Sequence, residues 1–418
     1  MNPGLIVKLR PTGPWRIGPD SGARNRVDAI YHSDSLYSAV AHAMSRLGAL
    51  EEWLDATARA AAPVVCFSSC FPLVGKTLFV TPPRTVWPPG AASLTTGRVR
   101  WKSARFVPLS IVHDILSGRA LDENRWMLDG PSGCLMPAGK PGPFRASLRW
   151  SAAIDRLSGA AERHAAACLE FQPGAGLWTV ASFADDNARD QWQERVRAAF
   201  RWLTDSGFGG ERSRGWGRSE APEFEEGLLP EMILGAAKMN AGGPDVLPPL
   251  EEPPLEVPPA MEPAPDNPDV NPPEPPADPE IPPPDPEPAF ADSSAEIAAP
   301  TSDVQSLGQA AILSPVSQPL APEPGPRGQW LLSLFSPAAR DAVEWSRGNY
   351  SLIERGGRVE SSSGSGGLKK QVQMVAEGSV LYAGGALCGA APDVAPEGFA
   401  HPVFRAGFAL AIPLPEVS

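Results

Sequence analysis

Hydrophobic residues recur along this chain with two different periods, and these periods predict its first strands and helices. The stretch "GLIVKLRP" near the start is apolar and β-prone, which predicts a strand. In "YHSDSLYSAVAHAMSRLG" the apolar residues follow one another at steps of four, four and three, which is helical spacing: Leu36, Val40, Met44 and Leu47. Ser33 or Asp34 is a natural N-cap for this helix, and Gly48 is a natural end.

A second helix is predicted in "DDNARDQWQERVRAAFRWLTDSG". Its first turn is acidic, and its apolar stripe ends at Gly207: Trp192, Val196, Ala199, Phe200 and Leu203. Further strands are expected at "PVVCFSSCFPLV", "LWTVASFA" and, after a glycine-rich loop, "GRSEAPEF". The order strand, helix, strands, helix, loop and strand is typical of an α+β fold with a ferredoxin-like (RRM-like, βαββαβ) unit.

The composition changes abruptly at residue 229. From there to residue 326 the chain is dominated by prolines and carboxylates and has almost nothing to bury, which predicts a disordered insertion. Globular composition resumes at "GQWLLSLFSP" and continues to the end. We therefore expect an N-terminal domain over 1–228, a linker over 229–326 and a C-terminal domain over 327–418.

The net charge of −12 hides an uneven distribution of charge. Residues 241–300 contain 14 Asp or Glu and no Lys or Arg, so the rest of the chain carries −12 + 14 = +2. A slightly basic folded part is compatible with a nucleic-acid partner. The start has no apolar run of signal-peptide length and no stretch is apolar enough to span a membrane, so we expect a soluble, cytoplasmic protein without a membrane partner.

The five cysteines include no CxxC pair, and neither HExxH nor an Asp/Glu cluster marks a metal site in the folded parts. Cys66 and Cys70 are expected to be buried thiols. We therefore predict neither a metal nor a cofactor.

The loop "GFGGERSRGWG" at 207–217 is the strongest candidate for binding chemistry. Glycines permit positive φ and close approach of a ligand to the backbone, arginines pair with phosphates, and a tryptophan can stack on a base. The loop lacks GxxxxGK[ST] and follows a helix where a Rossmann loop would open one, which excludes both nucleotide motifs. A helix C-cap followed by a turn, with Trp216 in the core, is the alternative. The candidate residues for binding phosphates and bases are Gly207, Gly209, Gly210, Arg212, Ser213, Arg214, Gly215, Trp216, Gly217 and Arg218.

Two further basic stretches are candidates for contact with RNA. "GRVRWKSARF" alternates basic and apolar residues, which predicts a strand or hairpin with a charged face carrying Arg98, Arg100 and Lys102. "LKKQVQM" offers Lys369 and Lys370 after a flexible stretch. A solvated surface is the alternative for both.

The glycine-rich loop resembles that of the RAMP superfamily of CRISPR proteins. "HSDSLYSAV", "RWKSARFVPLSIV", "SAAIDRLSGAA" with "GAGLWTVASF", "SLIERGGRVESSS", "LKKQVQMVAEGSVL" and "HPVFRAGFALAIPL" resemble, in order, one RAMP subgroup, the fourth subunit of the type III-A (Csm) interference complex. The Pro/acidic insertion departs from that subgroup.

This resemblance implies two ferredoxin-like RAMP domains that hold the repeat-derived 5′ handle of the crRNA. It also implies docking to the large polymerase-like subunit and to the backbone RAMP subunit of the type III-A complex, so that the protein caps one end. Members of the subgroup are not thought to cleave RNA, and RAMP hairpins of the 97–106 kind often wedge between nucleotides.

His32, Ser33 and Asp34 at the entry to the first helix allow three interpretations. They contact RNA, they have a structural role at the helix entry, or His32 is a general acid or base. The last would make the protein a metal-independent crRNA-processing endoribonuclease. A scaffold that makes only protein contacts is a further alternative.

Overall fold

The structure is a computed structural model, and it describes residues 1–19, 22–89, 101–154, 156, 159–235, 326–361 and 364–415. Most of the predicted linker lies outside these residues, as do Arg98 and Arg100. The described residues belong to one compact unit of contacts, although they come from both ends of the chain. The predicted division into 1–228, 229–326 and 327–418 stays a prediction.

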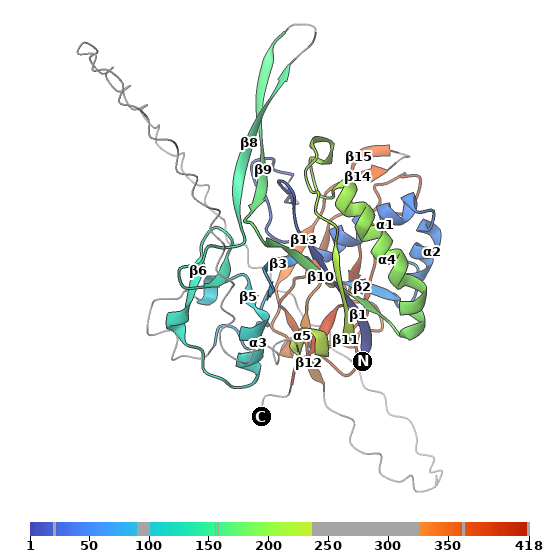
Figure 1. The fold of residues 1–418 in the computed structure, drawn as a ribbon. Coiled ribbons are helices and arrows are strands. Elements are labelled where there is room, and N and C mark those ends of the chain that lie inside the picture. The colour runs from blue at the N-terminus through green and yellow to red at the C-terminus, as the bar shows by residue number, and fades with distance from the viewer. Residues whose placement is uncertain are drawn as a thin grey trace, which may run out of the picture. The chain divides into compact units, whose positions relative to one another are not determined.

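The part before residue 236 mixes helices and strands (Figure 1). Its helices are α1 (Ser33–Arg46), α2 (Leu50–Ala56), α3 (Leu109–Leu116), α4 (Asp186–Ser206) and α5 (Glu231–Leu234). Its strands are β1 (Asn2–Leu9), β2 (Val65–Phe67), β3 (Phe71–Val74), β4 (Thr77–Val80), β5 (Val107–Pro108), β6 (Trp126–Asp129), β7 (Cys134–Pro137), β8 (Phe144–Ile154), β9 (Ala161–Phe171), β10 (Ala175–Phe183) and β11 (Glu223–Leu229).

A seven-stranded sheet organises this part in the order β11-β1-β10-β3-β4-β5, with β2 also paired to β10. Strand β10 is antiparallel to β1, β2 and β3, and β1 is antiparallel to β11. Helix α1 packs on α4, and both contact strands of the sheet. Strand β1 is buried along nearly its whole length, which explains why Leu5, Ile6 and Val7 are apolar in succession instead of alternating with polar residues.

Helix α1 confirms the predicted period and the predicted end at Gly48, which follows the C-cap residue with φ 74°, but not the predicted start. Leu36, Val40 and Met44 are fully buried, whereas Leu47 follows the helix and is 45% exposed. The N-cap residue is His32, and the helix itself begins at Ser33. The side chains of Ser33 and Asp34 do not cap the helix but bond to Leu334 and Arg355 in the C-terminal part of the chain.

Helix α4 begins and ends as its sequence predicts. The side chain of Asp185 accepts a hydrogen bond from the amide of Ala188 at 2.7 Å, and the helix ends at Gly207 with φ 76°. The expected strand at 217–224 begins only at Glu223. Residues 219 and 220 instead pair with Thr204 and Arg10 through their amides and complete the loop after α4.

The part from residue 326 is built of short strands. They are β12 (Arg327–Leu331), β13 (Leu352–Arg355), β14 (Arg358–Ser361), β15 (Gly364–Leu368), β16 (Val372–Val375), β17 (Val380–Ala383), β18 (Gly389–Ala390), β19 (Gly407–Phe408) and β20 (Ala411–Pro413). Three of them form a sheet in the order β17-β12-β20. Trp330, Leu332 and Phe408 belong to the same buried core as Leu5 and Phe67, so the two ends of the chain share one core.

Candidate nucleic-acid interface

The glycine-rich loop starts where α4 ends, and Phe208 anchors it in the core. The Phe208 ring packs edge-on against Trp15 and Tyr31, with centroids 4.6 and 5.2 Å apart. An aromatic side chain between two glycines thus fixes the loop to the long connection between β1 and α1.

The glycines of this loop let the backbone pass close to other backbone of the same chain. A Cβ on Gly207 would lie 2.5 Å from the Trp216 carbonyl oxygen, and one on Gly217 would lie 2.1 Å from that of Phe208. Both residues have positive φ. The amides of Gly210 and Gly217 donate to the carbonyls of Arg16 and Pro14, at 2.8 and 3.0 Å. Those two amides are therefore used inside the protein, and the guanidinium groups are the chief binding chemistry that the loop presents.

The loop arginines differ in their surroundings. Arg212 is half-buried and Arg218 is exposed, as is Ser213. Arg214 pairs with Glu211 at 3.2 Å and also reaches Ser151 Oγ and His164 Nε2, both at 3.2 Å. Since Ser151 and His164 belong to β8 and β9, Arg214 joins the loop to that hairpin. Trp216 is half-buried, so its ring is neither fully enclosed in the core nor fully exposed for stacking on a base.

The β8–β9 hairpin projects from the body of the molecule in Figure 1. Its strands pair residue by residue from Phe144↔Phe171 to Ile154↔Ala161. One face carries exposed apolar side chains, among them Trp150 (63% exposed) and Ile154 (68%). The Arg163 guanidinium lies over the Trp150 ring, 5.1 Å from its centroid.

The sequence placed a hairpin at 97–106, and for residues 101–106 this was wrong. Trp101–Ser103 is a turn of 3₁₀ helix, and Trp101 and Phe106 are buried in the core. Burial of both aromatic rings, and not a charged strand face, explains the alternation. Lys102 is exposed, and Arg98 and Arg100 lie outside the described residues.

Residues 22–28 contribute basic side chains to this surface that were not predicted from the sequence. Arg24 and Arg26 are exposed, and the amide of Ala167 in β9 donates to the Arg24 carbonyl at 2.8 Å. Arg16, before them, is buried. Two arginines within the four residues "ARNR" could have indicated a basic surface here.

His32, Ser33 and Asp34 are buried, with exposed fractions of 3%, 5% and 2%. His32 Nδ1 lies 2.8 Å from Glu377 Oε1 and Nε2 lies 3.3 Å from Asp28 Oδ2. The Ser33 hydroxyl accepts the Leu334 amide at 3.0 Å. These contacts favour the structural role at the helix entry over contact with RNA.

Asp34 is the centre of a buried ion-pair cluster. It accepts hydrogen bonds from Arg355 Nε and Nη2, at 3.1 and 3.0 Å, and it also pairs with Arg405. Burial alone would raise the pKa of Asp34, but the two guanidinium groups outweigh burial and hold the pKa below its ordinary value. Burial likewise opposes the charged form of His32, yet Glu377 and Asp28 raise its pKa to about 9. Two separated stretches of the chain are thus joined by buried charges.

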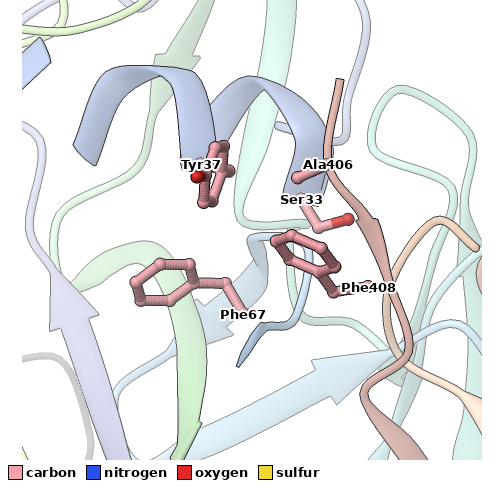
Figure 2. Close-up of a pocket in the computed structure, with 5 residues that line it drawn as sticks. All are labelled: Ser33, Tyr37, Phe67, Ala406 and Phe408. Carbon is pink, nitrogen blue, oxygen red and sulfur yellow. The ribbon is translucent and has the colours of Figure 1, made fainter. Parts of the chain in front are cut away.

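A small cavity beside this cluster is lined by Ser33, Tyr37, Phe67, Ala406 and Phe408 (Figure 2). Tyr37 packs edge-on against Phe408 with centroids 5.6 Å apart, and its hydroxyl bonds Thr57 Oγ1 at 2.7 Å. The cavity measures about 10 Å³, which is at the limit for one water molecule. A cavity of this size is too small for an organic ligand.

Lys369 is half-buried and Lys370 is exposed, and their amides donate to Gly357 and Val394 at 2.9 and 3.0 Å. They lie just after β15, and contact with RNA stays a prediction for both.

Within the described ranges, no group of three or more His, Cys, Asp or Glu side chains could hold a metal ion. Cys70 is buried, as predicted, and Cys66 is half-buried. No helix in the same ranges is long and apolar enough to cross a membrane.

Comparison with known proteins identifies the C-terminal part first. The family model described as the CRISPR Csm4 C-terminal domain matches residues 326–414. No curated protein matches the chain. Among solved structures, one similar chain comes from a Csm3–Csm4 subcomplex in the type III-A CRISPR-Cas interference complex. It has 12% identity and a TM-score of 0.51, over 98% of this chain and 99% of that one.

A chain from a Csm1–Csm4 cassette in complex with cA4 is also similar, with 15% identity and a TM-score of 0.48 over 99% of this chain and 98% of that one. The Csm3–Csm4 match shows a shared fold over nearly the whole length, and the family model adds the sequence of the C-terminal domain. Residues 326–414 therefore match the Csm4 C-terminal domain, and the fold of the chain resembles that of the similar chain in the Csm3–Csm4 subcomplex.

Proposed function

We propose that this protein is the non-catalytic RNA-binding subunit of a type III-A CRISPR effector complex, where it anchors the 5′ handle of the crRNA. The observation that carries the proposal is the set of Arg214 contacts with Ser151 and His164. Through these contacts Arg214 lies beside the outer half of the projecting hairpin, three residue pairs from the Ile154↔Ala161 end of its ladder. Such an arrangement suits a single-stranded RNA whose phosphates pair with arginines while its bases stack on exposed aromatic rings.

Phosphate binding falls to Arg212, Arg214 and Arg218, with Arg24 and Arg26 close by on the neighbouring segment. Trp150, backed by Arg163, offers an exposed aromatic ring on which a base can stack. Lys102, Lys369 and Lys370 are secondary candidates.

The strand order supports a ferredoxin-like N-terminal unit. Strands β1, β2/β3, β10 and β11 with helices α1 and α4 follow the βαββαβ order, and β1 and β10 are central. The described residues from 326 onward contain strands but no α-helix, so we propose a reduced version of this unit there.

The partners proposed are the large polymerase-like subunit and the backbone RAMP subunit. The solved structures that this chain resembles contain Csm1–Csm4 and Csm3–Csm4 pairs, and a position capping one end of the complex follows from the same analogy. A cytoplasmic location belongs to the same proposal.

The processing endoribonuclease remains the competing function. It requires His32 to reach a 2′-hydroxyl, whereas His32 is 3% exposed and bonded to Glu377 and Asp28. Its burial supports the non-catalytic role.

The test uses the purified full chain with a labelled crRNA that carries its 5′ repeat handle, and the same RNA without the handle. Binding and product length are followed together. We expect handle-dependent binding with intact RNA. Specific cleavage would support the endoribonuclease, and equal weak binding to both RNAs would favour the scaffold.

A further inference from the structure

Arg16 lies beneath the proposed RNA-binding surface with 7% of its surface exposed. We propose that it is the positioning residue of that surface: it holds residues 23–26, strand β9 and the glycine-rich loop in register without touching RNA. This inference rests on the proposed function, and it concerns how the surface is kept ready for its ligand.

The guanidinium of Arg16 bonds four backbone carbonyls from two segments, the longest bond being that from Nη1 to Arg26 at 3.4 Å. Nη1 donates to Arg24 at 2.8 Å and to Ala167 at 2.9 Å, and Nη2 donates to Ala23 at 3.0 Å. A charged donor makes stronger hydrogen bonds than a neutral one, and its planar fork fixes the direction of each. The side chain therefore ties the segment with exposed Arg24 and Arg26 to the middle of strand β9 in the hairpin.

The backbone of Arg16 holds the third segment, the glycine-rich loop. Its carbonyl accepts the Gly210 amide at 2.8 Å, and a Cβ on Gly209 would lie 2.6 Å from that same oxygen. A Cβ on Gly210 would lie 3.0 Å from Arg16 Cδ. Gly209 and Gly210 thus allow the loop to lie directly on Arg16, which gives them a reason other than contact with a ligand.

The charge of Arg16 fits a positioning role. Burial lowers its pKa, and nearby Glu211 opposes that effect. Glu211 pairs with Arg214, which reaches the hairpin. Arg16 and Arg214 therefore both connect the glycine-rich loop to the β8–β9 hairpin. Arg16 is buried, whereas Arg214 is exposed.

Arg10 offers a matched control, because it begins the same connection between β1 and α1 and its side chain also donates to backbone carbonyls. It donates to the carbonyls of Gly174 and Gly75, at 2.6 and 3.0 Å, and pairs with Glu223. The variants are Arg16→Met and Arg10→Met, with Arg16→Lys in case the first does not fold. Hydrogen exchange, handle affinity and its dependence on salt are measured for each in the full chain.

We expect Arg16→Met to raise hydrogen exchange at 22–28, in β9 and at 207–217, and Arg10→Met not to do so. Handle affinity should fall about tenfold if the competent arrangement falls to about a tenth of the population. The slope of log affinity against log salt should stay unchanged, because no phosphate contact is removed. Arg16→Lys should fall between Arg16→Met and the unaltered chain.

Two results would overturn the proposal. Unchanged exchange in these segments would show that Arg16 does not position them. A salt slope reduced by about 0.7, the value for one phosphate on a single strand, would show that Arg16 binds RNA directly. If the unaltered chain does not bind the handle, the proposed function fails, and the exchange data still decide whether Arg16 orders the three segments.

Discussion

Arg355 and Asp34 form a buried two-pronged ion pair, 321 residues apart in sequence. Because Arg405 pairs with the same carboxylate, one aspartate at the start of α1 holds two cations from the C-terminal part of the chain. The motif that looked like a binding site is thus a junction between the two ends of the chain.

Asp34→Asn should lower the free energy of unfolding by about 3–5 kcal/mol, since two buried guanidinium groups lose their counter-charge. Urea unfolding of the full chain measures it. Asp114→Asn breaks an exposed pair with Arg119 and serves as the control, with an expected loss of about 0–1 kcal/mol. Equal effects of the two variants would contradict a structural role for Asp34.

His32 should make stability fall as the pH rises. Its folded pKa of about 9 lies above its ordinary value of 6.5, so its contribution is full below pH 6.5 and is lost as the pH passes through about 9. Burial works against the charge of Glu377, but His32 holds the Glu377 pKa below its ordinary 4.5, so that contribution is lost as the pH falls.

Urea unfolding at about pH 6 and about pH 9.5 checks this expectation, with Glu377→Gln as the comparison. The variant should lose less stability than the unaltered chain between the two conditions. The same loss in both proteins would argue against the His32–Glu377 pair as its source.

Gly217→Ala should disturb the loop far more than Gly215→Ala. Both residues have φ 79°, but a Cβ on Gly217 would lie 2.1 Å from the Phe208 carbonyl, and one on Gly215 has nothing within 4 Å. We expect Gly215→Ala to cost about 1–2 kcal/mol, the cost of the left-handed conformation alone. Thermal unfolding compares the two, and a larger effect at Gly215 would mean that backbone crowding is not what requires glycine.

Arg212→Ala combined with Arg214→Ala should weaken handle binding without unfolding the protein. If each arginine neutralises one phosphate, the slope of log affinity against log salt should shrink by about 1.4 in total. Circular dichroism verifies folding. Arg119→Ala with Arg125→Ala removes two exposed arginines that pair with Asp114 and Asp122, and should leave binding intact.

Unchanged affinity in a folded Arg212/Arg214 double variant would remove these two residues from the site. A loss of the same size in the Arg119/Arg125 variant would mean that only the overall charge of the chain matters.

The sequence by itself determined the elements whose signals are local. The 3.6-residue period of Leu36, Val40 and Met44 is set by the geometry of a single helix, and Gly207 ends α4 because the chain needs positive φ there. The position of the glycine-rich loop after α4 was predictable for the same reason.

Only the tertiary structure decided which charged and aromatic residues are buried. The sequence left RNA contact, a structural role and catalysis open at His32 and Asp34 because the partners Arg355, Arg405 and Glu377 lie more than 300 residues away. The stretch 97–106 was predicted to be a strand or hairpin with a charged face because alternation of basic and apolar residues does not reveal that the Trp101 and Phe106 rings are turned into a core. Burial depends on long-range packing, and one local stretch of sequence does not contain it.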